Sequence, residues 1–586
     1  MKNLSFKAIS KSLAVLGVLL TIGLGGCESY LDLPESAFLN DDDVFGTYED
    51  FQGFEDNMYR RVIPYLTYSI TASLNWGDDV VNNRTFPPSG AVDIGDYWYF
   101  WNNTLQNILV KNGDDIGGVW NGSWSGIRIA NLCLQKLDEG FPQQATAEQK
   151  NLLRGQALFF RAWFHQELIR FYGGMPYVDV VFSPQDELRL DRLSFQATTD
   201  RIVDDYDAAI PLLPESWDIV TGYGRVTKGA AYAFKAKALL YAGSPLMNNE
   251  VGNGFTFNQT HMEAAAEAAS QVINLANQGV YRLLSWPEYS DNFHKNNGDL
   301  LGSDEIIFSP VVPQAGKARM STFHGRVFNN SRWEGNNVME APTANYVELF
   351  EMANGLPTSD PASGYDPSNP WVNRDPRFDY NLLLDGTKWA DGGNENTNFV
   401  QLYLGGGDRG TGGSLTGYMI KKYWPRGVNR LDNNWNNFRF GQAHMRLADV
   451  YLIYAEAVNE VWGPTTPPPF SSLTAVDAIN IVRNRAGMPN VDSKFTGSKE
   501  VFRDRIWNER AVELAFEGSR WFDIRRWHVA HLKEYKELFG LEFDKDKTFF
   551  RRTLVINRVF DERHYWIPID RNQSQLYEGF NQNPGW

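Results

Sequence analysis

The sequence predicts a mainly α-helical protein in which helical hairpins form a scaffold for a large, irregular, loop-rich portion with minor β-structure. Two observations support this prediction. Apolar residues recur at spacings of three and four through two blocks, about 120–280 and 440–535. The stretches 75–119 and 280–440 are instead rich in Asn, Gly, Pro and aromatic residues, without sustained helical period. Loops of this length are usually functional or disordered, and their aromatic content argues against disorder.

Composition places the chain among folded proteins and argues against nucleic acid as a partner. Of its 586 residues 43% are hydrophobic and 14% aromatic, which is ample for a core. The formal net charge is −16, and nothing in the chain reads as a basic stripe.

The N-terminus has the pattern of an export signal. Three lysines precede a twelve-residue apolar run, Leu13–Leu24, which is too short for a membrane-spanning helix of about 20 residues. Leu24-Gly25-Gly26-Cys27 then resembles the lipobox of bacterial lipoproteins, in which the cysteine becomes the lipidated first residue. We therefore predict a signal peptide over residues 1–26 and a lipid anchor at Cys27; the alternative is a soluble protein cleaved at small residues.

The predicted mature chain begins with an acidic tether. Residues 28–50 read as loop, so we expect a tether over residues 27–45 and a single folded domain over residues 46–586. Cys133 is the only cysteine besides Cys27, so no internal disulfide is expected, and its apolar surroundings indicate a buried packing role.

The first helical block predicts five helices in order. The first spans about Trp120 to Leu137, and the second opens with the capping pair Thr146 and Gln149 and ends at Gly173. The third helix carries an apolar series that starts at Ile202, and it ends at Pro214. The fourth has its series from Ala231 and ends at Gly243. The fifth begins at a predicted cap at Thr260 and ends at Gly279.

The second block predicts three more helices: Leu447 to Val461, a helix begun by Thr474 and closed by Gly487, and one from about Ser498. Small residues, mostly Ala, lie on the facing sides of these helix pairs. Such pairs are typical of tetratricopeptide-type hairpins, although the 34-residue repeat is not regular here.

The stretch Asn508–Trp527 mixes charges with large rings, and we expect it to lie on one helix. Glu513 and Glu517 would then be one turn apart, with Arg510 and Arg520 each three residues outside them. A buried charge is costly without a partner, so this pattern predicts structural ion pairs. The alternative is a ligand-binding helix.

Motifs along the chain resemble the SusD/RagB family of nutrient-binding outer-membrane lipoproteins. The strings that carry the resemblance, in order after the lipobox, lie at Leu153–Pro176, Gly224–Leu246, Arg374–Phe378, Thr416–Tyr423, Arg446–Glu460, Ala475–Gly487, Asn508–Trp527 and Gln582–Trp586. The resemblance implies tetratricopeptide-like hairpins supporting a loop-rich half. It also implies a lipid-anchored protein exposed at the cell surface that captures oligosaccharide and passes it to a SusC-like TonB-dependent transporter in the outer membrane.

The first irregular stretch holds the residue types that bind sugars. Trp rings offer flat apolar faces, and Asp, Asn and Arg offer planar polar groups for hydroxyl pairs. The resemblance implies, for starch-binding members, a site built from Asp, Arg, Trp and Asn of this region and from aromatics shortly before a Pro-Thr helix start. The candidate ligand-binding residues are Asp78, Asp79, Arg84, Trp98, Trp101, Asn103, Trp286, Tyr289 and Trp333.

Other functions receive less support from the sequence. A peptide-binding member of the same family is the first alternative, and a glycoside hydrolase the second. Adjacent carboxylates such as Asp78 and Asp79 rarely converge on one substrate, so we predict no enzymatic activity. We predict no cofactor or catalytic metal, while a structural cation in the Asn- and Gly-rich loops stays open. His528 and His531 could ligate a metal, but the Arg-rich helix end argues against a cation site there.

Overall fold

The computed structural model describes most of the chain after the predicted tether. The described residues are 40–63, 65, 75–82, 89–100, 118–183, 185–186, 189–218, 222–296, 303–309, 333, 338, 340–410, 412–432, 438–441, 443–575 and 577–586. The predicted signal peptide, Cys27, Arg84, Trp101 and Asn103 lie outside the described residues.

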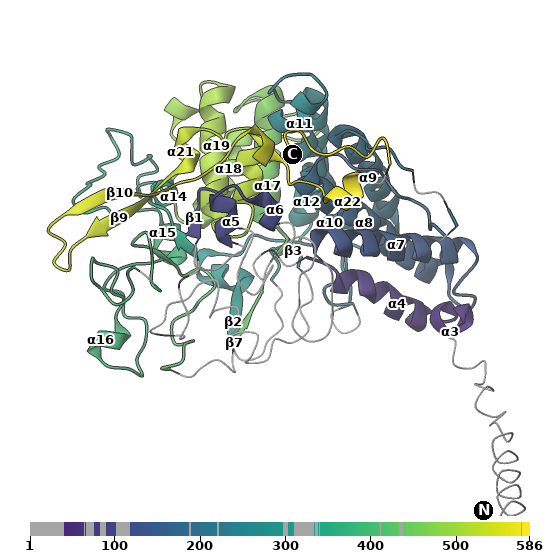
Figure 1. Cartoon of the computed structure of the whole chain (residues 1–586), viewed down its shortest axis with the longest axis horizontal. Coiled ribbons are helices and arrows are strands. Elements are labelled where there is room, and N and C mark those ends of the chain that lie inside the picture. Colours follow the sequence, from purple (N-terminus) through teal and green to yellow (C-terminus); the bar gives the residue numbers. More distant parts are fainter. Residues whose placement is uncertain are drawn as a thin grey trace, which may run out of the picture.

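Long helices form the scaffold, at the right and upper centre of Figure 1. They are α7 (Val119–Asp138), α8 (Ala147–Tyr172), α9 (Phe195–Ala209), α10 (Lys228–Ala242), α12 (Gln259–Asn277), α17 (Leu447–Trp462), α18 (Ala475–Arg485) and α19 (Lys499–Glu513). Consecutive helices pack in pairs, α7 on α8 and α8 on α9, and α12 joins the two blocks by packing on both α10 and α17. The mainly α-helical, hairpin-based fold is confirmed.

Helix boundaries follow local capping chemistry. Thr146 and Gln149 form a reciprocal capping box at the start of α8, and Thr474 and Asp477 form another at the start of α18. These boundaries were predicted. The predicted cap at Thr260 is wrong, because the Asn258 side chain accepts the N–H of His261 and begins α12 two residues earlier.

The expected loop over residues 28–50 is wrong where the structure describes it. Helix α3 (Asp41–Phe45) begins at a capping box of Asn40 and Asp43, and α4 (Tyr48–Arg60) follows it. Asp41 also pairs with Lys136 of α7 at 2.6 Å. The three consecutive aspartates that suggested a solvated tether are therefore a helix N-terminus, where acidic side chains are favourable. The folded body begins by Asn40.

The single helix expected over Asn508–Trp527 is also wrong. Helix α19 ends at Glu513, and the chain turns through Phe516 and Gly518, which have φ angles of 61° and 76°, before α20 (Arg520–Arg526). Phe516 packs in one hydrophobic core and Trp521 in the other, so the turn serves both.

Short helices and turns connect these elements. They are α5 (Ser89–Asp93), α6 (Tyr97–Phe100), α11 (Pro245–Glu250), α14 (Ala344–Val347), α15 (Pro376–Asn381), α16 (Glu395–Asn398), α21 (Lys533–Lys536) and α22 (Arg571–Ser574), with 3₁₀ helices η3 (Ile210–Leu212), η4 (Trp286–Asn292), η6 (Ser493–Phe495) and η7 (Glu562–Tyr565).

The β-structure of the described residues is limited to antiparallel two-stranded pairs. The pairs are β1 (Val80–Asn82) with β4 (Glu340–Pro342), β2 (His294–Asn296) with β7 (Phe438–Phe440), β3 (Ile306–Phe308) with β8 (Met445–Arg446), β5 (Leu382–Leu383) with β6 (Met419–Ile420), and β9 (Glu537–Phe543) with β10 (Phe550–Asn557). The β9–β10 hairpin projects at the left of Figure 1, away from the long scaffold helices. Most pairs join distant segments and so fasten the loop-rich half together.

The two larger hydrophobic cores of the described residues match the two halves of the molecule, and a third, small cluster holds Val81, Leu538 and Ile556. The first lies between the scaffold helices and includes Trp163, Leu452 and Trp521. The second lies among the loops and includes Trp389 and Trp424. Within the described residues, no helix is both long and apolar enough to cross a membrane.

Candidate ligand-binding surface

Asp78, a predicted ligand contact, lies inside the protein just before β1. Its carboxylate accepts two hydrogen bonds from Arg520 at the start of α20, with Nε–Oδ1 and Nη2–Oδ2 distances of 2.7 and 3.0 Å. Both side chains are buried. This bidentate pair fastens the β1 region to α20 and satisfies the charge of each partner.

Asp79 is also buried, and among the described residues neither of its carboxylate oxygens has a hydrogen-bond partner. Burial raises its pKa first, and the nearby carboxylates of Asp78 and Glu340 raise it further, to about 7, against opposing effects of Arg520 and Arg558. Its backbone carbonyl accepts the N–H of Thr343 beside β4. Both aspartates therefore belong to a buried charged cluster in this structure, and a ligand role for them stays a prediction.

Three aromatic candidates gather in the second core. Trp333 is fully buried and its indole N–H donates to the Thr397 carbonyl at 2.7 Å. Tyr289 is fully buried too, and stacks on Trp286 with centroids 5.1 Å apart. Trp286, on η4, is only partly buried. It is therefore the ring of the three with surface left for a ligand, while the other two pack internally.

Trp98 lies apart from these rings, on α6, and is partly buried. Its ring meets Trp586 edge to face, with centroids 5.9 Å apart at 82°. The guanidinium of Arg571 lies 5.2 Å from its centroid, and that of Arg563 lies 4.9 Å from the centroid of Trp586. Both arginines are exposed. We call these four residues the Trp98 patch.

The C-terminal residue positions the Trp98 patch. The Trp586 indole N–H donates to the backbone carbonyls of Arg563 and Trp566, at 2.9 and 3.0 Å. Tyr97, buried beside Trp98, stacks on Trp586 at 6.0 Å. The patch thus offers partly exposed rings beside guanidinium groups, which suits both the apolar face and the hydroxyl or carboxylate groups of a sugar.

Sequence reasoning missed Trp586, Arg563 and Arg571 as neighbours of Trp98. The terminal motif Gln582–Trp586 was noted only for its resemblance to a family pattern. An available signal was the aromatic residue itself, since tryptophan is highly buried on average and is therefore expected to pack against another segment. Its partner lies almost five hundred residues earlier in the sequence, so the local pattern could not identify it.

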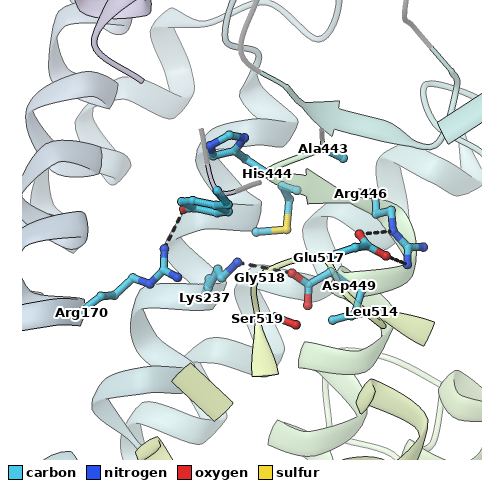
Figure 2. Close-up of a pocket in the computed structure, with 12 residues that line it drawn as sticks. Arg170, Lys237, Ala443, His444, Arg446, Asp449, Leu514, Glu517, Gly518 and Ser519 are labelled. Atoms are coloured by element: carbon cyan, nitrogen blue, oxygen red, sulfur yellow. Dashed lines mark hydrogen bonds and ion pairs between the residues drawn. The ribbon is translucent and has the colours of Figure 1, made fainter. Parts of the chain in front are cut away.

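A small polar pocket, lined mostly by buried residues, lies where the scaffold meets the loop-rich half (Figure 2). Lys237 of α10 approaches Asp449 of α17 at 3.5 Å, and Arg446 binds Glu517 at 2.7 Å across it. Burial lowers the pKa of Lys237, with Asp449 opposing the shift. The cavity volume is about 20 Å³. That is room for about one water and not for a sugar ring, so these charges hold the two halves together.

Comparisons with known proteins agree with this architecture. A family model described as the SusD family matches residues 304–586, and one described as starch-binding associating with outer membrane matches residues 68–240. The chain belongs to the SusD family.

Two SusD-like proteins are similar to this chain over most of its length. The SusD-like protein P2 of Formosa agariphila is 24% identical over 548 residues, covering 90% of this chain and 92% of that protein. A SusD-like protein of Bacteroides ovatus is 24% identical over 468 residues, covering 76% and 72%.

Solved structures show the same fold. The crystal structure of a SusD-like protein from Bacteroides fragilis superposes with a TM-score of 0.71 at 24% identity, covering 95% of this chain and 100% of that one. The surface glycan-binding protein A from Bacteroides uniformis superposes with a TM-score of 0.60 at 17% identity, covering 92% and 99%.

Proposed function

We propose that this protein is a lipid-anchored surface protein of the outer membrane that binds glycan without cleaving it and delivers it to a SusC-like TonB-dependent transporter. The observation that carries the proposal is the ordered match of two SusD family models, one described as starch-binding, along residues 68–240 and 304–586. A structural neighbour named as a surface glycan-binding protein supports the ligand class. The lipobox at Cys27 supports the anchor.

The proposed binding surface is built around Trp98. Trp101 and Asn103 come shortly after Trp98 in the sequence, although they lie outside the described residues. If each ring loses about 50 Å² of exposed surface to a sugar, burial contributes roughly 1 kcal/mol per ring. A few such contacts with hydrogen bonds give a dissociation constant in the high-micromolar to millimolar range. Weak binding suits a protein that releases its ligand to a transporter.

Isothermal titration with a panel of oligosaccharides tests the proposal. We expect saturable binding by the parent protein and a loss of about five- to tenfold in Trp98→Ala and in Trp101→Ala, because each removes an apolar face. Trp462→Ala is the matched control, since Trp462 is a partly buried tryptophan at the end of α17 that packs on Phe470.

The outcomes separate the candidate functions. Glycan binding by the parent that persists in both Trp98→Ala and Trp101→Ala would refute the site. Binding of peptides with no response to any glycan would favour the peptide-binding alternative. Release of shorter sugars from a polysaccharide, abolished by a single Asp substitution, would identify a hydrolase. A folded Arg571→Ala variant that binds more weakly would extend the site to the Trp98 patch.

A further inference from the structure

Two histidines and a glutamate converge on one side of the scaffold. His528 and His531 follow α20, and Glu562 begins η7. One ligand atom from each lies within 4.8 Å of the others. The Nε2 of His528 is 3.1 Å from Oε2 of Glu562, and Nδ1 of His531 is 4.0 Å from Oε1. We call these three residues the His528 cluster.

The backbone of His528 is held in an unusual conformation. Its φ angle is 59°, in the left-handed region. The turn is a Schellman motif: the N–H of His528 donates to the Arg525 carbonyl at 2.9 Å, and that of Val529 to the Ile524 carbonyl at 3.0 Å. Glycine usually fills this position, and a residue with a Cβ costs about 1–2 kcal/mol there. Such strain is typical of positions where the side chain has a function.

Aromatic rings fix the imidazole of His528. Phe255 stacks on it at 3.6 Å and 10°, and Tyr565 stacks on it at 4.5 Å and 27°. The Tyr565 hydroxyl also lies 2.6 Å from Nδ1 of His531. Ring orientation is therefore set before any ligand arrives, which lowers the entropic cost of binding.

The neighbouring arginines do not occupy the cluster. Arg525 points inward and donates to the Tyr565 carbonyl, while its guanidinium lies 3.8 Å from the Trp521 centroid. Arg526 forms a bidentate pair with Glu456, at 2.6 and 2.7 Å. The sequence argument against a cation site rested on these two charges. The structure shows that both are directed to other partners.

We propose that the His528 cluster binds a divalent first-row transition metal, with Zn²⁺ the best match. Two imidazoles and one carboxylate suit Zn²⁺, whereas Ca²⁺ and Mg²⁺ require mostly oxygen ligands. Ligands about 2.0–2.1 Å from a tetrahedral ion lie about 3.3 Å apart. The His528–Glu562 separation already fits, and Glu562, with 69% of its side chain exposed, is free to adjust toward His531. The metal replaces the His531–Tyr565 hydrogen bond.

Such an ion joins two segments of the C-terminal region. The first is the turn that follows α20, a helix that contacts α11; the second is η7. Binding to the folded state alone stabilises it by mass action, so hundredfold excess of metal over its dissociation constant should raise the thermal midpoint by about 2 °C. This role is separate from glycan binding.

The test is a titration of chelator-treated, tag-free protein with Zn²⁺, by calorimetry and by competition with a chromophoric chelator. We expect one Zn²⁺ per chain, a visible absorption band when Co²⁺ replaces it, and no response to Ca²⁺. The glycan titrations are repeated with and without Zn²⁺, so that failure of either proposal is distinguishable from failure of the other.

Two variants each remove one metal ligand and are expected to leave the fold intact. His528→Gly places glycine where the backbone favours it, and Glu562→Gln changes an exposed side chain. Each should weaken Zn²⁺ binding by at least about tenfold and so reduce the thermal shift at the same Zn²⁺ concentration by about half or more. His261→Gln and Glu534→Gln are matched controls, because His261 lies on α12 and Glu534 is exposed on α21, both outside the cluster. No Zn²⁺ binding by the parent, or unchanged binding in both ligand variants, would overturn the proposal.

Discussion

At the scale of single residues, Asp79 and Asp78 are neighbours with opposite energetic roles. Asp78 is neutralised by Arg520, while Asp79 is buried beside other carboxylates without a hydrogen-bond partner among the described residues. Its pKa of about 7 in the fold exceeds the usual value of 3.8. The protonated form therefore contributes stability that is fully present below pH 3.8 and is lost as the pH rises through about 7.

Asp79→Asn should stabilise the protein at pH 8, because it removes a buried charge and preserves shape. The gain relative to the parent should be on the order of 2 kcal/mol larger at pH 8 than at pH 5, since a tenfold change in proton affinity corresponds to about 1.4 kcal/mol. Urea unfolding at both pH values measures it. Asp78→Asn is the contrasting control and should destabilise at both pH values, because it removes the charge that neutralises buried Arg520. A gain for Asp79→Asn that is equal at pH 5 and pH 8 would contradict the assignment.

At the scale of elements, the sequence predicted what local chemistry determines. The caps at Thr146 and Thr474 lie within three residues of their partners, so both helix starts could be identified from the sequence. The strands could not, because β1 pairs with β4 across more than 250 residues. The same reason governs the site: the partner of Asp78 lies 442 residues away, so its burial was invisible in the local pattern.

Packing between α7 and α8 shows how context overrides helix propensity. Gly126 and Phe164 are both buried, and a Cβ added at Gly126 would lie 2.2 Å from the Phe164 ring. Gly126→Ala should therefore destabilise by about 1–3 kcal/mol through overpacking, although alanine is intrinsically favoured in helices. Gly53→Ala in α4 is the matched control: its position is exposed, with nothing within 4 Å of the new Cβ.

For Gly53→Ala we expect stabilisation of up to about 1 kcal/mol. Thermal unfolding of both variants, followed by circular dichroism, shows directly whether each substitution stabilises or destabilises the protein. If both substitutions stabilised the protein, α7 and α8 would have to separate at Gly126 without cost, against the packing described.

At the scale of the whole molecule, Glu513 joins the two halves. It ends α19 and is fully buried. It accepts hydrogen bonds from Arg446 at 2.6 Å, from Arg377 of α15 at 3.0 Å, and from Arg485 at the end of α18. Burial alone would raise its pKa, but Arg485, Arg446 and Arg377 together lower it well below the usual value. One carboxylate thus neutralises charges from both helical and loop-rich segments.

Glu513→Gln should lower the stability of both halves of the molecule at once. Removing the charge leaves buried arginines partly uncompensated, which costs about 3–5 kcal/mol near pH 7.

Because the folded-state pKa is lowered, the stability from Glu513 is present above about pH 4.5 and is lost as the pH falls toward the folded-state value. Below pH 4.5, the free energy of unfolding of Glu513→Gln should therefore change less with pH than that of the parent does. Urea unfolding, followed by circular dichroism for the helices and by the fluorescence of tryptophans that lie in both cores, should shift together as one transition. Asp504→Asn, an exposed acid on the same helix, should change stability by less than about 0.5 kcal/mol. If only one signal shifted in Glu513→Gln, the two cores would unfold independently, and the junction would not couple them.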